Sequence, residues 1–406
     1  MRKKLIVFTS TFPRWKDDTD PPFVYELSRR LVSDFEVHVL APNYPGALRA
    51  ETMDGMEVHR FRYFWSCFEK LAGSSGILPT LKKNKLYYLL IPFFIMAEFL
   101  ALLKLVRKIK PDVVHAHWLI PQGIIAAIVK KITGTPYLVT AHGGDVFGLQ
   151  GGLFGFLKRF SLDNADQVTV VSSVIKQVVL GISDSKVVPV VLPMGVDPRK
   201  FELEEDNGLI RVKYGVKGPF LLFVGRLTEK KGVGYLLEAM PEIISRVPDL
   251  KLLVIGSGEE EENLKQLSDS LNIGGNVIFA GSIPNRDLPQ FYGAADIFIG
   301  PSIRAKGGDT EGFGLTFVEA GMSGCILIGS KVGGITDIIK DGETGFLIEE
   351  KNPAALAGKV LEVVGLKNEW PEIRKRNRQV FVDNFGLDVI AEKYAQLLAD
   401  VGDQLN

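Results

Sequence analysis

The sequence is poor in cysteine and shows no excess of either charge. Its 406 residues include 2 cysteines, Cys67 and Cys325, which are far apart and match no metal-binding spacing. This excludes a disulfide framework, and such cysteine usage indicates a reducing cytosol. The 48 Lys and Arg residues balance 48 Asp and Glu residues. The whole chain therefore lacks the basic excess that is typical of nucleic-acid-binding proteins.

The first residues also lack the pattern of a secretory leader. "MRKKLIVFTSTFP" passes from basic residues into an apolar stretch, which polar and turn residues end too early for a signal peptide. We therefore expect a cytoplasmic protein.

Short apolar runs alternate with amphipathic helical stretches in both halves of the chain. The first half has "KLIVFTS", "FEVHVLAP", "PDVVHAHW", "PYLVTAHGGD" and "QVTVVSS", and the second has "FLLFVGRL", "LKLLVIGSG", "NVIFAGSI", "ADIFIGPS" and "CILIGS". Runs of this kind are typical of buried parallel strands. The chain is too long for one core, so we predict an α/β fold of two doubly wound domains, with ligands at the carboxyl ends of the strands. Prolines near "VVPVVLPMGVDP" place the domains at residues 1–190 and 191–374.

Two strand ends in the second half carry groups suited to a diphosphate. "FVGRLTEKKG" places Arg226 after a predicted strand and Lys230 and Lys231 in the turn before a helix. Fixed cations at a helix N-terminus suit phosphate binding, although a solvated basic turn would show the same pattern. The loop Gly256-Ser257-Gly258 is an incomplete dinucleotide fingerprint and also fits a tight strand-to-helix turn.

The stretch "GDTEGFGLTFVEAGMSG" holds two glutamates, Glu311 and Glu319, around a Gly-Phe-Gly turn. If a helix begins near Leu315 or Thr316, Glu311 lies in the loop before it and Glu319 one turn inside. For Glu319 the alternative is a capping box from Thr316, in which the carboxylate returns to a backbone N–H. Further along, Gly333-Gly334 would cradle a sugar or phosphate, or simply form a turn.

The first half offers histidines at predicted strand ends. His115 and His117 share a face of one strand, so they would act together, form a metal pair or be core residues. His142 lies beside two glycines and Asp145, which suits ligand contact. The run Asp18-Thr19-Asp20 has metal-binding spacing, but no strand precedes it and turn chemistry explains it.

Together "GRLTEKKG", "EGFGLTFVE", "GGITDIIKDGETGFLI", "HAHW", "AHGGD" and the "LPMGVDPRKF" linker resemble glycosyltransferase family 4, retaining sugar-nucleotide enzymes of GT-B fold. The resemblance spans nearly the whole chain. It implies two facing Rossmann-like domains with a cleft between them. The C-terminal domain would hold the donor and the N-terminal domain the acceptor, and a last helix, at about 375–406, would cross back.

The resemblance also assigns roles to residues. Arg226 and Lys231 would hold the donor diphosphate, Glu311 would contact the transferred sugar, and His142 would touch it near the anomeric carbon. Glu319 would bind the ribose hydroxyls. The other donor-binding residues expected on this basis are Gly312, Phe313, Gly314, Gly225 and Gly256. Members of the family need no metal or cofactor, and we find no metal ligand set in this sequence.

The implied reaction transfers a sugar from a nucleotide-diphosphate sugar to a hydroxyl of an acceptor, such as a lipid-linked sugar or a growing polysaccharide. No double-displacement carboxylate pair is apparent, so cations on the leaving diphosphate would do the main work. Two alternatives share the layout: a non-hydrolysing sugar-nucleotide epimerase and a catalytically silent sugar-nucleotide-binding protein.

Two loops depart from the family pattern. The loop after the first strand contains Pro21 and Pro22, which have no N–H. Acceptor contacts would then come from side chains, with Arg14, His117 and Asp145 as candidates. The inserted "RAKGGD" adds Arg304, Lys306 and Asp309, either near the donor site or as a solvated loop.

One long apolar run, Leu86 to Leu103, is flanked by Lys82, Lys83 and Lys85 and by Lys104, Arg107, Lys108 and Lys110. It approaches the length of a transmembrane helix, but Pro92 and Glu98 interrupt it. A spanning helix, a buried domain helix and an interfacial helix are the alternatives. The N-terminal half carries an excess of about +8 charges, which favours contact with an anionic membrane surface, and the aromatic residues of Phe61 to Lys70 would add an apolar wedge.

Overall fold

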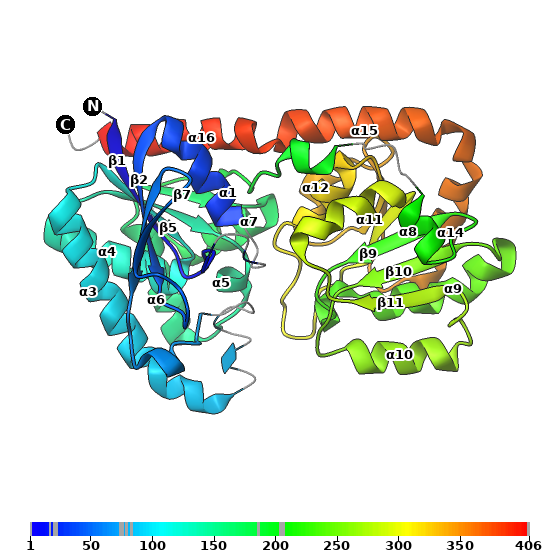
Figure 1. Cartoon of the computed structure of the whole chain (residues 1–406), viewed down its shortest axis with the longest axis horizontal. Coiled ribbons are helices and arrows are strands. Elements are labelled where there is room, and N and C mark those ends of the chain that lie inside the picture. The colour runs from blue at the N-terminus through cyan, green and yellow to red at the C-terminus, as the bar shows by residue number, and fades with distance from the viewer. Residues whose placement is uncertain are drawn as a thin grey trace. The chain divides into compact units, whose positions relative to one another are not determined.

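The computed structural model describes residues 2–15, 18, 23–72, 77, 80–81, 84–184, 187–202 and 208–403. They form two compact units (Figure 1). Unit 1 combines Met1–Gly195 with Leu387–Asn406, and unit 2 is Val196–Gly386. The expected limits were 191–374. Unit 2 begins instead at Val196 and continues to Gly386, because helix α15 (Trp370–Phe385) packs within it. The Phe381 ring lies so close to Gly321 that a Cβ there would meet it at 2.7 Å.

Unit 1 is built on an eight-stranded sheet of order β3-β4-β2-β1-β5-β6-β7-β8. All neighbouring pairs are parallel except β3 and β4. The predicted runs form β1, β2, β5, β6 and β7. The strands are β1 (Lys3–Phe8), β2 (Phe35–Pro42), β3 (Ala50–Met53), β4 (Met56–Phe61), β5 (Val113–His117), β6 (Tyr137–Ala141), β7 (Gln167–Val170) and β8 (Val190–Val191).

The hairpin of β3 and β4 was not expected from the sequence. It turns at Asp54 and Gly55, which both have positive φ, 44° and 83°. An Asp-Gly pair is a strong signal for the tight hairpin turn that needs such backbone angles. The flanking residues contain charged and polar side chains, so their apolar pattern alone does not mark them as strands.

Helices flank this sheet. Helices α3, α4 and α6 pack in series, and α16 contacts α1, β5 and β6. Near the termini, marked N and C in Figure 1, Lys3 Nζ lies 2.7 Å from Asp403 Oδ1. The helices of unit 1 are α1 (Phe23–Arg30), α3 (Ile91–Ile109), α4 (Ile124–Thr133), α5 (Gly144–Phe147), α6 (Gly152–Asp163), α7 (Ser173–Ile182) and α16 (Leu387–Asp403).

The long apolar run forms α3 and the 3₁₀ turn Lys85–Leu90 before it. Pro92 stands in the first turn of α3, where a proline is tolerated. Glu98 is fully buried on the inner face and accepts a hydrogen bond from Gln122 Nε2 at 2.8 Å. Burial raises the pKa of Glu98 to about 8, although this hydrogen bond opposes the rise. The inner face of α3 therefore packs against β1, β2 and β4.

Unit 2 has a six-stranded sheet of order β11-β10-β9-β12-β13-β14, in which every pair is parallel. Its predicted strands form β9 to β13. They are β9 (Phe220–Val224), β10 (Lys251–Ile255), β11 (Val277–Gly281), β12 (Ile297–Gly300), β13 (Ile326–Ser330) and β14 (Phe346–Ile348). Because neighbouring strands run the same way, their carboxyl ends meet at one edge, and the loops there can form a site.

The helices of unit 2 cover a core of buried apolar residues that includes Leu236, Leu237 and Met240 of α9. They are α8 (Leu209–Lys213), α9 (Val233–Arg246), α10 (Glu261–Ser270), α11 (Leu288–Ala294), α12 (Leu315–Met322), α13 (Ile335–Ile338), α14 (Pro353–Gly365) and α15.

Candidate functional site

The loops after β9 and β10 approach each other closely at the carboxyl edge of unit 2. Gly225 follows β9, and its N–H donates to Ile255 O at 3.0 Å. Gly256 has a φ of 137°, and a Cβ there would meet Gly225 O at 1.9 Å. Glycine is therefore needed at Gly256 for the backbone packing of the two loops. Their role in donor binding stays a prediction.

The loop after β9 also touches the long loop that follows β12. The N–H of Ile303 donates to Lys230 O at 2.8 Å. Gly232, in the left-handed region with a φ of 64°, lies where a Cβ would meet Pro301 O at 2.0 Å. These contacts bring the cations of the first loop to the carboxylates of the second.

Lys231 and Glu311 form an ion pair across these two loops, between Lys231 Nζ and Glu311 Oε2. Both side chains are mostly buried, 15% and 12% exposed. Burial by itself would raise the pKa of Glu311, but the charges of Lys231, Lys230 and Arg226 outweigh it and hold that pKa below its ordinary value. Glu311 is therefore a carboxylate at neutral pH.

The inserted loop contributes a second pair beside the first. Lys230 Nζ lies 3.1 Å from Asp309 Oδ2, so Asp309 is brought to the same edge. The backbone N–H groups of Arg304 and Lys306 donate to Glu350 and Glu229, at 2.6 and 3.3 Å. Arg226 is exposed, and its charge reaches Glu311. The edge thus carries several charges of both signs within one pair of loops.

Gly312, Phe313 and Gly314 lead into α12, which begins at Leu315 as expected. Gly314 has left-handed backbone angles, with a φ of 103°. A Cβ on Gly333 would meet Glu311 O at 2.2 Å, and one on Gly334 would meet Gly312 O at 2.5 Å. The glycine pair 333–334 therefore lets the backbone pack against the loop of Glu311, and its N–H at Gly334 donates to Glu311 O at 3.0 Å.

Glu319 lies one turn inside α12, where the capping-box alternative is wrong. The residue before the helix is Gly314, and Thr316 is already helical. The Glu319 carboxylate instead accepts a hydrogen bond from Tyr292 Oη at 2.8 Å. Burial raises the pKa of Glu319 to about 7, against the opposing effect of this hydrogen bond. Glu319 is therefore poised to change its charge near neutral pH.

Three histidines lie together in unit 1: His115 and His117 on β5, and His142 directly after β6. His115 Nε2 is 2.8 Å from Thr140 Oγ1, and His117 Nδ1 is 3.0 Å from His142 Nε2. His115 and His117 are fully buried, whereas His142 is half-buried. Burial lowers the pKa of His142 to about 3 and also lowers those of His115 and His117. All three imidazoles are neutral at physiological pH.

His142 is enclosed by aromatic rings that the sequence analysis did not single out as site residues. The centroids of Trp118 and Phe23 lie 4.9 and 5.2 Å from that of His142. Trp118 has a φ of 75°, rare for a bulky side chain. The "HAHW" motif contained Trp118, but its contact with His142 depends on the loop after β6.

Asp145 holds this loop rather than reaching into solvent. Its Oδ1 accepts from the N–H groups of His142 and Gly143, both at 3.0 Å, and its Oδ2 from that of Leu119 at 2.8 Å. Asp145 is 4% exposed, and burial raises its pKa against the effect of these bonds. Any role of Asp145 toward an acceptor would therefore act through the position of His142.

Arg14 is engaged within its own loop. Its Nε and Nη2 donate to the carboxylate of Asp18 at 2.7 and 2.6 Å, and the guanidinium lies over the rings of Trp15 and Tyr44. The Asp18 carboxylate therefore serves as the ion-pair partner of Arg14. The remaining residues of the Asp-x-Asp run, Thr19 and Asp20, lie outside the described residues, as do Pro21 and Pro22.

Comparison with known proteins identifies both halves of the chain. Residues 22–200 match the profile of Glycosyltransferase Family 4, and residues 209–380 match that of Glycosyl transferases group 1. An uncharacterized glycosyltransferase of Methanocaldococcus jannaschii is 32% identical over 300 residues, 70% of this chain and 72% of that protein.

Two named relatives are more distant in sequence. A GDP-mannose-dependent alpha-(1-6)-phosphatidylinositol monomannoside mannosyltransferase of Mycolicibacterium smegmatis is 26% identical, over 69% of this chain and 74% of its own. An N-acetyl-alpha-D-glucosaminyl L-malate synthase of Bacillus anthracis is 28% identical, over 71% and 75%.

Solved structures show the same fold. Sucrose-phosphate synthase of Thermosynechococcus elongatus aligns with a TM-score of 0.79 at 21% identity, over 99% of this chain and all of its own. The HepE protein of Anabaena, solved in complex with UDP, aligns with a TM-score of 0.76 at 16% identity, over 98% of this chain and all of its own. The predicted GT-B fold is confirmed.

The raised pKa of Glu319 predicts a stability effect that is independent of any ligand. Between about pH 4.5 and pH 7 the native state binds more protons at this site than the unfolded chain, so stability is lost as the pH rises through this window. Glu319→Gln removes the buried charge. We expect the variant to be more stable than the parent at pH 8 by on the order of 2 kcal/mol, and equal to it near pH 4. Denaturant unfolding across pH measures this, with exposed Glu262→Gln as control, and parallel stability curves for parent and variant would contradict it.

Proposed function

Because the chain belongs to the family 4 glycosyltransferases, we propose that it transfers a hexosyl group from a nucleotide-diphosphate sugar to a hydroxyl of an acceptor. We propose further that the reaction retains the anomeric configuration and needs neither metal ion nor cofactor. The observation that supports this most is the Lys231–Glu311 ion pair with Arg226 beside it, at the carboxyl edge of unit 2. It combines cations for a diphosphate with a carboxylate for a sugar.

Charge accounts for the proposed roles. In the transition state of glycosyl transfer, positive charge develops at the sugar and negative charge on the departing diphosphate. Lys231 would stabilise the diphosphate, since a mostly buried cation held by Glu311 needs little reorganisation during the reaction. Exposed Arg226 would add a second cation. Glu311, kept ionised by the same cations, would accept hydrogen bonds from the sugar hydroxyls. Glu319 would accept those of the ribose.

The acceptor side has a different character. His142 is a neutral imidazole between aromatic rings. A neutral ring can accept or donate one hydrogen bond without repelling the positive charge that develops at the anomeric carbon. We therefore assign His142 to contact with the transferred sugar, and His117, bonded to it at 3.0 Å, to fixing its orientation.

Product analysis separates this proposal from the two alternatives. Each nucleotide sugar is incubated with the protein alone and then with an acceptor. A glycosyltransferase forms a new glycoside and free nucleoside diphosphate only when the acceptor is present. Conversion of the nucleotide sugar to its epimer without acceptor would indicate the epimerase, and binding without turnover would indicate the silent protein.

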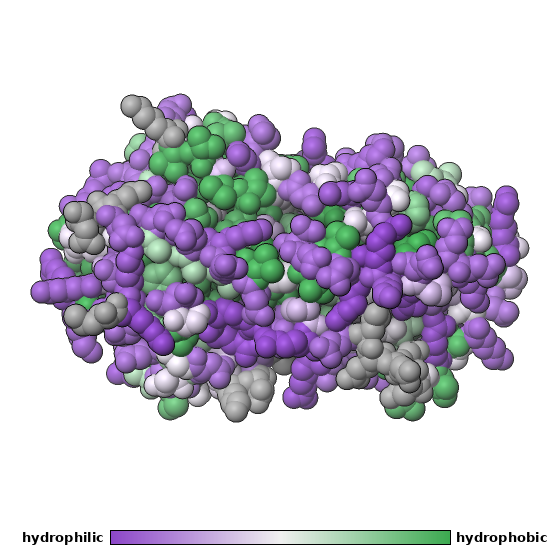
Figure 2. All heavy atoms as spheres, turned by 90° about the horizontal axis from the view of Figure 1, so that it is seen from above, coloured by the Kyte–Doolittle hydropathy of each residue, from purple (hydrophilic) through white to green (hydrophobic). Residues whose placement is uncertain are grey.

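We propose that the acceptor is lipid-linked and that unit 1 docks at the inner face of the membrane. Figure 2 shows a face on which hydrophilic residues predominate and apolar ones gather in patches, including one on the left, over unit 1. Among the described residues, one helix is long and apolar enough to cross a membrane, and it is the segment that contains α3. Since the inner face of α3 packs on the sheet, we assign its outer face to the membrane surface.

The outer face of this helix is apolar and ends in basic residues. Leu89, Phe93, Met96 and Leu100 are each more than half exposed. Their spacing places them on one side of a helix, and Lys104 and Arg107, both exposed, continue that side.

The Phe64 ring lies 5.3 Å from that of Phe93. Trp65 and Phe68, which come after Phe64 in the sequence, are also exposed. An apolar strip with basic residues at one end suits anionic lipid. One relative named above acts on a phosphatidylinositol mannoside, which supports a lipid acceptor.

Removal of the Lys231 charge should weaken donor binding. Lys231→Met keeps the aliphatic stem, so the loss of one charge-assisted contact should cost about 1.5 to 3 kcal/mol, roughly tenfold or more in affinity for a nucleoside diphosphate. Calorimetric titration measures this. Lys265→Met removes an exposed cation from α10 and should change nothing. Equal affinities of parent and Lys231→Met would contradict the assignment of Lys231 to the donor diphosphate.

Glu311→Gln should separate binding from turnover. It frees Lys231 from its partner, so donor affinity should be kept or improved, while kcat should fall by more than about tenfold, at least 1.4 kcal/mol of barrier. Steady-state kinetics with a nucleoside diphosphate readout measure both. Asp309→Asn removes the carboxylate paired with Lys230. It is the control for the loss of a negative charge near the site. A kcat of Glu311→Gln within twofold of the parent would exclude a transition-state role.

Membrane docking is tested by flotation with vesicles. The protein should float with vesicles that contain anionic lipid at low salt and should be released as salt rises. Phe93→Asp with Met96→Asp should abolish binding, whereas Val212→Asp, at a still more exposed apolar position of unit 2, should leave it intact. Absence of binding to anionic vesicles at low salt would refute surface docking, and binding that resists high salt and carbonate would favour insertion.

A further inference from the structure

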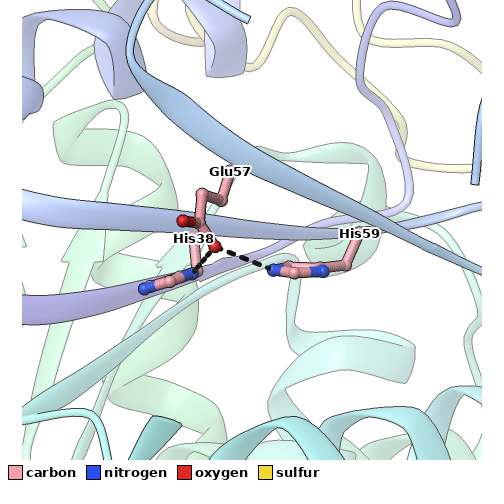
Figure 3. A group of neighbouring side chains, drawn as sticks. All are labelled: His38, Glu57 and His59. Carbon is pink, nitrogen blue, oxygen red and sulfur yellow. Dashed lines mark ion pairs between the residues drawn. The ribbon is translucent and has the colours of Figure 1, made fainter. Parts of the chain in front are cut away.

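A second cluster of titratable groups lies away from the histidines described above, near the edge of the unit 1 sheet. His38 is on β2, and Glu57 and His59 are on the neighbouring strand β4. In the parallel register His38 is opposite Glu57, and Leu40 is opposite His59. Because alternate residues of a strand share a face, the three side chains project to the same side. Figure 3 shows the carboxylate of Glu57 between the two imidazole rings.

The three groups present one ligand atom each toward a common centre. Glu57 Oε2 lies 3.2 Å from His38 Nδ1 and 3.8 Å from His59 Nε2. All three atoms lie within 4.8 Å of one another. A zinc ion about 2.0 to 2.2 Å from each ligand would need them roughly 3.3 Å apart in tetrahedral geometry. The carboxylate distances already come close, and a small rotation of the less buried His59 would complete the set.

Glu36 orients the first of these ligands. Its Oε1 lies 3.0 Å from His38 Nε2, so Nε2–H donates to that carboxylate. In a neutral imidazole this leaves Nδ1 without a proton and with its lone pair toward Glu57. A carboxylate, a histidine and a metal in this order are the usual arrangement around a metal-ligating histidine.

Apart from their approach to Glu57, the two ligand nitrogens have no polar partner among the described residues. His38 is 4% exposed, and neither His38 Nδ1 nor His59 Nε2 has a hydrogen-bond partner among the described residues. The carboxylates of Glu36 and Glu57 both lie beside His38 and favour a cation there.

We propose that His38 Nδ1, His59 Nε2 and Glu57 bind a divalent transition-metal ion, with zinc as the ion that best suits two imidazoles and one carboxylate. The side chain of Glu57 is 59% exposed, so solvent can supply the fourth ligand. The ion would tie β2 to β4. It would take no part in the transfer reaction, because β1 separates β2 from β5 and its histidines.

Cobalt binding tests the site directly. The full-length protein is freed of metal with a chelator and titrated with Co²⁺, whose visible absorption reports four-coordinate nitrogen and oxygen ligation. We expect one equivalent to bind and Zn²⁺ to displace it. Glu57→Gln and His59→Gln should each lower the affinity at least tenfold, and Glu36→Gln should lower it by about 10- to 100-fold through loss of orientation. Calorimetry with Zn²⁺ gives the same comparison without the spectrum.

Two controls make the test decisive. Glu392→Gln alters an exposed carboxylate of α16 in the same unit and should leave binding unchanged. Circular dichroism checks that each variant is folded, and if His59→Gln is not, exposed Glu57→Gln carries the comparison. Failure of the parent to bind either ion below about 10 µM, or equal binding by parent and Glu57→Gln, would overturn the proposal.

Discussion

The direction of the strands is the constraint on which the proposed chemistry depends. In each unit the central strands are parallel, so their carboxyl ends share one edge and residues far apart in sequence meet there. Lys231 and Glu311 are the clearest case, since one follows β9 and the other follows β12. Their pairing keeps a mostly buried carboxylate ionised and a lysine in place. Glycines at Gly232, Gly256 and Gly333 permit the backbone contacts that hold these loops together.

The carboxyl edges of the two sheets differ in charge, although the central strands of both sheets are parallel. The edge of unit 2 carries opposite charges close together, as a site for a charged leaving group requires. The corresponding edge of unit 1 carries neutral imidazoles, since burial depresses the pKa of each. Buried Asp145 supports the second arrangement by accepting three backbone hydrogen bonds. In the proposed transfer, the charged edge of unit 2 would receive the nucleotide-diphosphate sugar and the neutral edge of unit 1 the acceptor hydroxyl.

Much of the fold was predictable because buried parallel strands leave continuous apolar runs, and those runs became β1, β2, β5 to β7 and β9 to β13. The start of α12 was also predicted, but the capping box at Glu319 was not formed, because Gly314 takes the position before the helix. The sequence could not show that Glu319 bonds Tyr292, which lies on α11. Nor could it show that Phe23 and Trp118 enclose His142, or that His38, Glu57 and His59 converge, because such contacts depend on strand register and loop packing.

The proposed function depends on recognition of a nucleotide-diphosphate sugar by charges at the edge of unit 2. The most direct test is thermal unfolding of the intact protein with a panel of nucleotide sugars, compared with the free nucleosides and inorganic diphosphate. The account predicts that at least one nucleotide sugar stabilises the protein, by about 2.7 kcal/mol when present at 100 times its dissociation constant, and that the nucleoside alone does not. If no nucleotide sugar stabilises the protein more than the nucleoside or inorganic diphosphate does, the central claim is contradicted.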